Sequence, residues 1–140
     1  MSNDKMIGSP NFKWFGLAVQ ALVVLAAQPQ CCPSGEIACR LHSEATLLRR
    51  ILSKLACEGI LETREGRDGG YRLKRAPEEI SLKDIYLALE EKGPYCSAML
   101  DTTGDHAFGR EMHGSFCTLV QEINENVLQV LERHTVADLM

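Results

Sequence analysis

Residues 48–73 read LRRILSKLACEGILETREGRDGGYRL and carry the clearest structural pattern of the chain. Four aliphatic side chains in this stretch share the spacing of one buried helix stripe, namely Leu48, Ile51, Leu52 and Leu55. Gly59 predicts the end of that helix, and the short apolar segments 60–63 and 71–73 flank a glycine-rich turn. The pattern therefore predicts a helix that is followed directly by a β-hairpin.

Further helices are expected before this unit. The strongly apolar segment 12–27 predicts a mostly buried first helix that stops at Gln28 and Pro29. Ser34 is a good N-cap for a short second helix. The helix that contains the aliphatic stripe is expected to begin near Ser43.

Two more helices are expected after the hairpin. Ser81 opens a helix over residues 82–91, whereas residues 95–109 show no clear periodicity. The last helix is predicted to run from about Met112 to His134. It carries a sustained apolar stripe, formed by Phe116, Val120, Ile123, Val127, Val130 and Leu131. A helix of this length needs a cover for its stripe, which predicts a homodimer; the alternative is that the stripe packs back on its own domain.

The order of these elements is that of a winged helix-turn-helix. Such a unit places its second short helix in the DNA major groove, while a basic hairpin tip reaches phosphates or the minor groove. We therefore expect DNA contacts from the turn, from the exposed side of that helix and from the hairpin. The predicted contact residues are Ser34, Ser43, Glu44, Thr46, Arg49, Arg50, Lys54, Arg64, Arg67, Gly69, Gly70, Tyr71 and Arg72.

Two of these predictions have a stated chemical basis. Arg49 and Arg50 can each present a guanidinium fork to a guanine edge or to a phosphate. Glu44 can accept a hydrogen bond from cytosine, or its carboxylate can stabilise the positive N-terminal end of the helix dipole. The second interpretation is preferred. Lys13 is expected to be a solvated surface lysine rather than a phosphate contact.

The charge distribution supports a local polyanion site. The chain has 15 Lys and Arg against 19 Asp and Glu, which gives a formal net charge of −4. Residues 40–75 hold nine Lys and Arg and five Asp and Glu, a net of +4, so the rest of the chain carries −8. A basic segment on an acidic remainder is typical of a specific polyanion surface, although a solvated face of mixed charge has the same composition.

Six cysteines occur without an export signal ahead of them, so the thiols are expected to be reduced in a cytoplasm. Cys31 and Cys32 precede a helix N-terminus, a position that lowers a thiol pKa and favours oxidation. Cys39 and Cys57 are expected to pack as small hydrophobic residues between helices. Cys117 is expected to be a buried or functionally idle side chain beside Phe116 and Val120 of the last helix.

The chain resembles the Rrf2 family of bacterial transcriptional regulators. The resemblance spans about residues 12–140 and is carried by several motifs, namely SGEIA (34–38), LRRILSKL (48–55), GIL (59–61), REGRDGGYRL (64–73), APEEISLKDI (76–85) and TVADL (135–139). It implies a homodimeric winged-helix protein, usually a repressor, that binds a palindromic site. It also implies that the long C-terminal helix makes the dimer.

Many members of that family bind an iron–sulfur cluster through three closely spaced cysteines, and this chain departs from that pattern. Only Cys96 is present in the equivalent stretch, and the next cysteine is Cys117. His106 and His113 lie between them, and histidine can replace cysteine on iron. No metal ligand set is predicted, although a Cys/His-ligated cluster stays open. Cys31, Cys32, Cys96 and Cys117 remain the candidate sensor thiols.

The predicted organisation has four parts: a flexible leader (1–11), a winged helix-turn-helix domain (12–92), a linker or sensor loop (93–111), and a dimerisation helix with a tail (112–140). The predicted function is a cytoplasmic, sequence-specific transcriptional regulator whose partner is double-stranded DNA. A redox change or a bound cofactor could switch it, and the effector is left open. The alternative is a winged-helix protein-interaction module that does not read DNA.

Two other classes are excluded by the sequence. The longest apolar run, residues 15–27, is interrupted by Gln20 and is shorter than the roughly 20 residues of a membrane span. No catalytic triad, phosphate-binding loop or dinucleotide fingerprint appears in a recognisable context, so the chain is not expected to be an enzyme.

Overall fold

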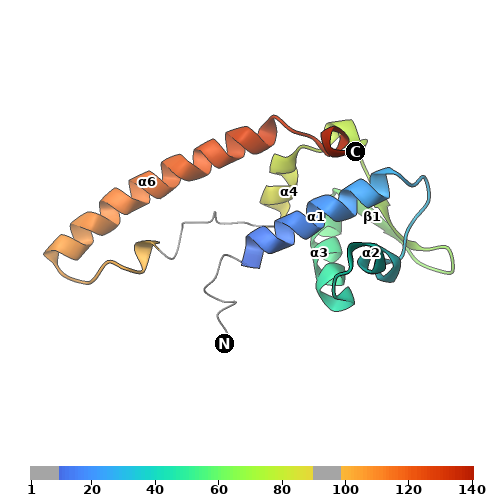
Figure 1. Cartoon of the computed structure of the whole chain (residues 1–140), viewed down its shortest axis with the longest axis horizontal. Coiled ribbons are helices and arrows are strands. Elements are labelled where there is room, and N and C mark those ends of the chain that lie inside the picture. Colours follow the sequence, from blue (N-terminus) through green and yellow to red (C-terminus); the bar gives the residue numbers. More distant parts are fainter. Residues whose placement is uncertain (1–9, 90–98) are drawn as a thin grey trace.

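The computed structural model describes residues 10–89 and 99–140 and shows a mainly helical chain with one two-stranded antiparallel hairpin (Figure 1). This architecture confirms the predicted fold class. In chain order the elements are α1 (Pro10–Ala26), α2 (Ser34–Leu41), α3 (Ala45–Cys57), β1 (Leu61–Arg64), β2 (Gly70–Leu73), the 3-10 helix η2 (Pro77–Glu79), α4 (Leu82–Ala88), α6 (Ala107–Glu132) and the 3-10 helix η3 (Val136–Leu139).

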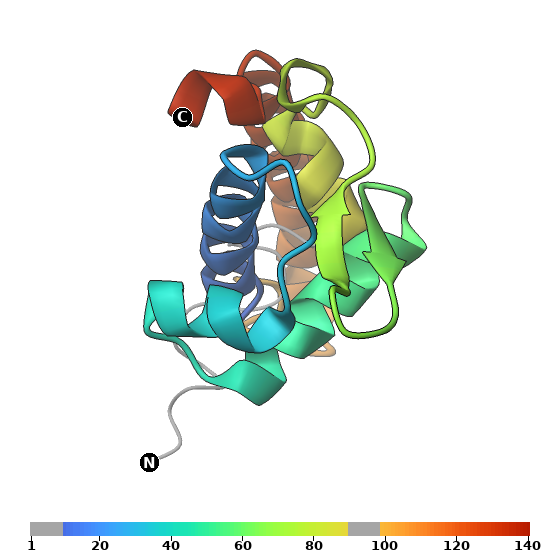
Figure 2. The same ribbon diagram turned by 90° about the vertical axis from the view of Figure 1, so that its right-hand side faces the viewer.

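The core lies between α1, α2, α3, α4 and the hairpin (Figure 2). The predicted stripe of α3 is fully buried, with Leu48, Ile51, Leu52 and Leu55 each at 0% exposure. α1 contributes Ala18, Ala21, Leu22 and Leu25 to the same cluster. The spacing that was visible in the sequence is therefore the spacing that closes the core, and burial of these side chains is the main force that holds the body together.

Left-handed residues end both helices of the helix-turn-helix. Gly59 has φ +81° after α3, and the N–H of Ile60 donates to the carbonyl of Leu55 at 3.0 Å. His42 takes the same role after α2 with φ +53°, where Ser43 N–H donates to the carbonyl of Ala38 at 3.0 Å. Both are the closing hydrogen bonds of Schellman caps. The tight turn between α2 and α3 therefore rests on a non-glycine residue in a conformation that glycine usually takes.

Two expected helix starts are shifted. Ser34 is not the N-cap of α2: Pro33 occupies that position, and Ser34 is the first helical residue without a capping hydrogen bond from its side chain. α3 begins at Ala45 with Glu44 as its N-cap residue, two positions after Ser43. Proline fits at a helix start because its missing N–H would have no intrahelical partner there.

The hairpin is tied to the loop that precedes α2. β1 pairs with β2 in the register Leu61 to Leu73, and Tyr71 forms an additional bridge with Cys32. The two residues exchange backbone hydrogen bonds of 2.8 and 2.9 Å. Gly70, at φ +132°, permits this approach, because a Cβ there would collide with the backbone carbonyl of Cys32. The loop thus acts as a short third strand of the wing.

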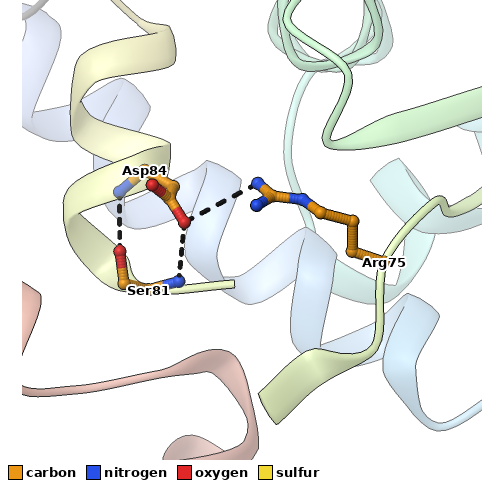
Figure 3. A network of polar contacts seen from close by, with 3 residues as sticks. All are labelled: Arg75, Ser81 and Asp84. Atoms are coloured by element: carbon orange, nitrogen blue, oxygen red, sulfur yellow. Dashed lines mark hydrogen bonds and ion pairs between the residues drawn. The ribbon is translucent and has the colours of Figure 1, made fainter. Parts of the chain in front are cut away.

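A polar network fixes α4 to the segment that follows the wing (Figure 3). Ser81 and Asp84 form a capping box, in which Asp84 N–H donates to Ser81 Oγ at 3.0 Å and Ser81 N–H donates to Asp84 Oδ2 at 3.1 Å. Arg75 places a guanidinium nitrogen 3.6 Å from the same carboxylate oxygen. The predicted start of this helix at Ser81 is confirmed. Its helical bounds end at Ala88, and residues 90–98 lie outside the described part of the chain.

The chain after α6 returns to the body. Ser81 and Thr135 form a bridge, Leu82 N–H donates to the carbonyl of His134 at 2.9 Å, and Val136 N–H donates to the carbonyl of Ile80 at 3.0 Å. Val136 is completely buried in the core. The C-terminal end of α6 is therefore anchored to the winged-helix body by both backbone pairing and apolar packing.

α6 begins at Ala107, five residues before the expected start near Met112. The side chain of His106 caps the helix, because its Nδ1 accepts the N–H of Gly109 at 3.0 Å. Gly109 lies against the backbone of Gly104, so the glycines that suggest a break in the sequence are sites of close packing. The helix extends far beyond the body (Figure 1). None of the described helices is both long and apolar enough to span a membrane.

Candidate nucleic-acid interface

The outer face of α3 is polar and basic. Thr46, Arg49, Arg50 and Ser53 are exposed on the side opposite the buried stripe. Arg49, Arg50, Ser53, half-buried Lys54 and exposed Cys57 line an open depression of about 410 Å³. One helix thus divides cleanly into a side that holds the core and a side that presents two guanidinium groups and an ammonium group to a partner.

The N-terminal end of α3 presents fewer side chains than expected. The Oγ atom of Ser43 is buried and has no hydrogen-bond partner within the part of the chain that the structure describes. Glu44 is the N-cap residue and is exposed, but its side chain accepts no capping hydrogen bond from the helix. Glu44 and Thr46 are therefore the open polar groups at this end, while Ser43 needs a rotation to reach a ligand.

The wing has a basic but not purely cationic tip. Arg64 and Arg67 are exposed, and so are Glu65 and Asp68. Arg72 is engaged in an ion pair with Glu62, the residue opposite it in the hairpin register. The pair is more than a third exposed, so it adds little stability. It does orient the Arg72 side chain toward the neighbouring strand. Arg64 and Arg67 are the wing arginines that form no ion pair with any described residue.

Three predicted contact residues of the wing have a structural duty as well. Gly69 is buried, and a Cβ there would collide with the backbone carbonyl of Arg64. Gly70 accommodates the carbonyl of Cys32, and Tyr71 packs half-buried against the core. The two glycines and the Tyr71 side chain are therefore needed for the conformation of the wing. A contact between their backbone and DNA stays a prediction.

One residue near this surface was missed by sequence reasoning. Trp14 of α1, the only tryptophan of the chain, lies under the guanidinium of Arg50, whose central carbon is 5.3 Å from the ring centroid. Trp14 falls inside an apolar segment, where an aromatic residue is indistinguishable from ordinary core. Only the packing of α1 against α3 reveals the pair.

The cysteines do not occupy the environments that the sequence suggests. Cys32 is buried at 1% exposure, and desolvation raises the pKa of its thiol, with the carboxylate of Glu36 raising it further. The expectation of a lowered pKa at Cys32 is therefore wrong, because burial outweighs the helix N-terminus. Cys39 and Cys57 are exposed, so their expected packing as small hydrophobic residues between helices is also wrong. Cys117 is exposed too, so it is not buried within this chain. Cys31 is half-buried, and Cys96 lies outside the described residues.

The described residues do not assemble a metal site. In residues 10–89 and 99–140, no three His, Cys, Asp or Glu side chains are placed to share an ion. His106 uses Nδ1 to cap α6, and His113 pairs through Nδ1 with Thr103 Oγ1 at 3.2 Å. The His, Cys, Asp and Glu side chains of the described residues therefore do not form a set that would hold an iron centre.

The fold and the basic face of α3 define a DNA-binding transcriptional regulator of the winged helix-turn-helix class. The chain belongs to the Rrf2 family: the family model, described as an iron-dependent transcriptional regulator, matches residues 13–140. This match confirms the resemblance that was drawn from the wing and helix motifs. It also confirms that the chain is not an enzyme, since the family consists of transcriptional regulators.

Curated relatives agree over most of the chain. A protein of Synechocystis sp. named as the HTH-type transcriptional regulator slr0846 is 31% identical over 87% of this chain and 81% of its own length. The HTH-type transcriptional regulator NsrR of Shouchella clausii is 30% identical over 88% of this chain and 83% of its own length. Among solved structures, a transcriptional regulator from Lactobacillus plantarum matches with a TM-score of 0.75 and 26% identity, covering 90% of this chain and 86% of that one.

Proposed function

We propose that this chain is a homodimeric repressor that binds a palindromic operator with α3 in the major groove. The observation that carries the proposal is the exposed basic face of α3 on a winged-helix body, opposite a fully buried stripe. The N-terminal residues of such a helix reach base edges, which assigns Glu44, Thr46 and Arg49 to base contacts. Ser34, Ser43, Arg50, Lys54 and the wing residues Arg64, Arg67, Gly69, Gly70, Tyr71 and Arg72 are assigned to the surrounding backbone.

The dimer is supported by a seam on α6. Apolar or amide side chains recur with alternating spacings of four and three residues, at Met112, Phe116, Leu119, Ile123, Asn126 and Val130. That period is the one of a two-helix coiled coil. Leu119 and Val130 are 43% and 44% exposed within a single chain, so the seam lacks a cover there. A second copy of the same helix supplies an apolar face of equal length.

An antiparallel arrangement of the two α6 helices fits a palindrome. The body of each copy is anchored at the C-terminal end of its own α6. A helix of 26 residues is about 39 Å long. Antiparallel helices would therefore set the two bodies at opposite ends of the seam. Half-sites one helical turn apart are separated by about 34–36 Å, a similar length.

The test of DNA binding is fluorescence anisotropy with genomic fragments selected by the purified protein. Arg49→Ala should weaken operator binding by about 1–3 kcal/mol if Arg49 reads a base. Arg133→Ala, which removes an exposed arginine at the end of α6, is the matched control and should leave binding unchanged. If the wild-type protein binds no duplex even at low salt, the interaction-module alternative replaces this proposal.

The test of the dimer is sedimentation at several concentrations. Ile123→Asp places a charge in the seam and should raise the dissociation constant at least about a hundredfold, because a carboxylate would be desolvated without a partner. Gln121→Asp adds the same charge at an exposed position off the seam and should leave the dimer intact. Equal weakening by both variants would contradict the seam.

The repressor assignment and a redox response are tested separately. Transcription from a promoter that overlaps the selected operator should fall when the protein is added. Cys32 is buried, whereas Cys31 is half-buried and Cys39, Cys57 and Cys117 are exposed. Of the accessible thiols, Cys31 and Cys117 are the predicted sensor candidates, so a redox response of operator binding is tested there first. Binding measured with dithiothreitol and with diamide, on wild type and on Cys31→Ser and Cys117→Ser, decides whether either thiol acts.

A further inference from the structure

The contact between Trp14 and Arg50 joins α1 to the outer face of α3. The guanidinium carbon lies 5.3 Å from the ring centroid, which is within the range of a cation–π interaction. Arg50 is exposed, Trp14 is half-buried, and Arg50 makes no ion pair with any carboxylate of the described residues. The aromatic ring is therefore the partner that orients this guanidinium.

The cation–π contact leaves the N–H donors of the arginine available for hydrogen bonds. A guanidinium contacts an aromatic ring through its flat face, while its N–H donors point outward in the plane. A side chain that is held in one orientation loses less conformational entropy when it binds a ligand. The ring thus prepares a fixed fork of donors at the surface of α3.

The position of this fork indicates its target. Arg50 is the sixth residue of α3 and is drawn toward α1, at the flank of the helix rather than at the N-terminal end where base edges are read. With α3 docked in the major groove as proposed, that flank would face the DNA backbone that borders the groove. A planar guanidinium matches two phosphate oxygens.

We propose that Trp14 is a positioning residue that holds Arg50 against a backbone phosphate at the edge of the operator groove. The inference rests on the proposed DNA-binding function and assigns a role to a residue of α1 in it. The ring restricts the orientation of the guanidinium, whose N–H groups donate to the phosphate oxygens. The contact contributes affinity without sequence preference.

A double-mutant cycle tests the pair through the affinity for the selected operator and for an unrelated duplex. Arg50→Gln should weaken both by the same factor, about tenfold, and should lower the slope of log K against log salt by about 0.9. Trp14→Leu should weaken both about two- to fivefold. Trp14→Leu should cost nothing further in the Arg50→Gln background, because there is no guanidinium left to position.

Conservative variants separate positioning from folding. Trp14→Phe keeps an aromatic face and should recover part of the affinity, whereas Arg50→Lys keeps the charge and should not recover the wild-type value. Thermal unfolding of each variant shows whether the body remains folded. If Trp14→Leu does not fold, Trp14→Phe with the two Arg50 variants completes the same comparison.

The single tryptophan supplies a direct optical readout. Its emission in the wild type should change when duplex is added, because a phosphate approaches the stacked guanidinium. Arg50→Gln should lose this change while anisotropy still records residual binding. A merely structural contact between α1 and α3 would leave the emission of Trp14 insensitive to DNA.

Three outcomes would overturn the inference. The two single losses could multiply in the double variant, the Arg50→Gln loss could be confined to the operator, or Arg50→Gln could have no effect. Loss of binding in Arg49→Ala together with unchanged binding in Arg50→Gln would reject this inference and leave the proposed function standing. Failure of the wild-type protein to bind any duplex would reject the proposed function itself.

Discussion

The winged-helix body and α6 differ in how much of their apolar surface is buried within a single chain. α3 buries four residues of its 13, and all four meet side chains of the same chain. α6 has 26 residues, of which only Gly109 and Val120 are buried. Phe108, Leu119 and Val130 of α6 are 67%, 43% and 44% exposed. The core of the body is therefore closed within one chain, while α6 leaves apolar side chains exposed, which the proposed dimer would cover.

The connection between α6 and the body, here called the joint, consists of residues 133–136 and is held by backbone hydrogen bonds and a buried side chain. The bridge of Ser81 with Thr135 and the burial of Val136 anchor the end of α6 beside α4. A change in how two α6 helices pair would therefore reach the bodies through backbone hydrogen bonds rather than through a loose tether. Matched substitutions in the two regions measure how different they are.

The largest contrast is expected for leucine truncation. Leu52→Ala in α3 should lower the free energy of unfolding by about 2–5 kcal/mol, since a completely buried side chain leaves a cavity. Leu119→Ala in α6 should lower it by less than about 1 kcal/mol in the monomer, because that side chain is already exposed. Urea denaturation at low protein concentration makes the comparison. Equal losses would mean that α6 is packed in the monomer.

Replacing glycine by alanine should destabilise the winged-helix body but stabilise α6. Gly70→Ala should destabilise the fold by at least about 1–3 kcal/mol, because the residue has φ +132° and its Cβ would collide with Cys32. Gly114→Ala should stabilise α6 by about 0.5–1 kcal/mol, since nothing lies within 4 Å of its Cβ and alanine favours helix. Thermal unfolding of both variants tests this. A neutral Gly70→Ala would show that the wing is not tied to the loop before α2.

A smaller difference is expected at the two capping boxes beside the joint. Asp84→Ala should cost about 1–2 kcal/mol, because it removes the cap of α4 and a weak, partly exposed pair with Arg75. Asp138→Ala removes the solvent-exposed capping hydrogen bonds of η3 and should cost about 0.5 kcal/mol. Chemical denaturation curves for both variants give the values. A larger loss of unfolding free energy in Asp138→Ala than in Asp84→Ala would show that the cap of η3 contributes more to stability than the cap of α4, which would contradict this prediction.

The smallest effect concerns pH and the buried thiol of the body. The pKa of Cys32 is raised above its ordinary value of 9.0, so the native state holds this proton more tightly than the unfolded chain. The stability that the proton confers is therefore complete below the ordinary pKa and is lost as the pH rises through the higher pKa of the native state. Unfolding free energies should therefore fall slightly as the pH rises above about 9, and Cys32→Ala should reduce that fall.

Thiol labelling of the native protein, resolved by peptide, gives the matching contrast with α6. The exposed Cys117 should react rapidly, whereas Cys32 should react only when the body opens. Rapid labelling of Cys32 in the folded protein would contradict its burial.

Much of the fold could be predicted because its signals are local. The aliphatic spacing of α3, the left-handed Gly59 and the capping residue Ser81 are all read within one or two helical turns. The start of α6 could not be predicted, because it depends on a histidine cap and on the packing of Gly109 against Gly104. Glycine is ambiguous in sequence, since it marks both a break in structure and a close approach of two segments.

The candidate site was predicted in part for a similar reason. The exposure of Thr46, Arg49 and Arg50 follows from their place opposite the aliphatic stripe. The commitment of Arg72 to Glu62 and the burial of the Ser43 hydroxyl follow from neighbours that only the fold brings close. The assignment of individual DNA contacts stays a prediction until the variants are measured.

The sequence by itself determined the winged helix-turn-helix, the side of α3 that faces outward, and the membership in the Rrf2 family. These properties depend on periodicity and motif, which are written in consecutive residues. Only the tertiary structure decided that Cys32 is buried while Cys57 is exposed, and that Trp14 lies under Arg50. Those properties depend on contacts between helices and loops far apart in the chain, and spacing along one segment holds no record of them.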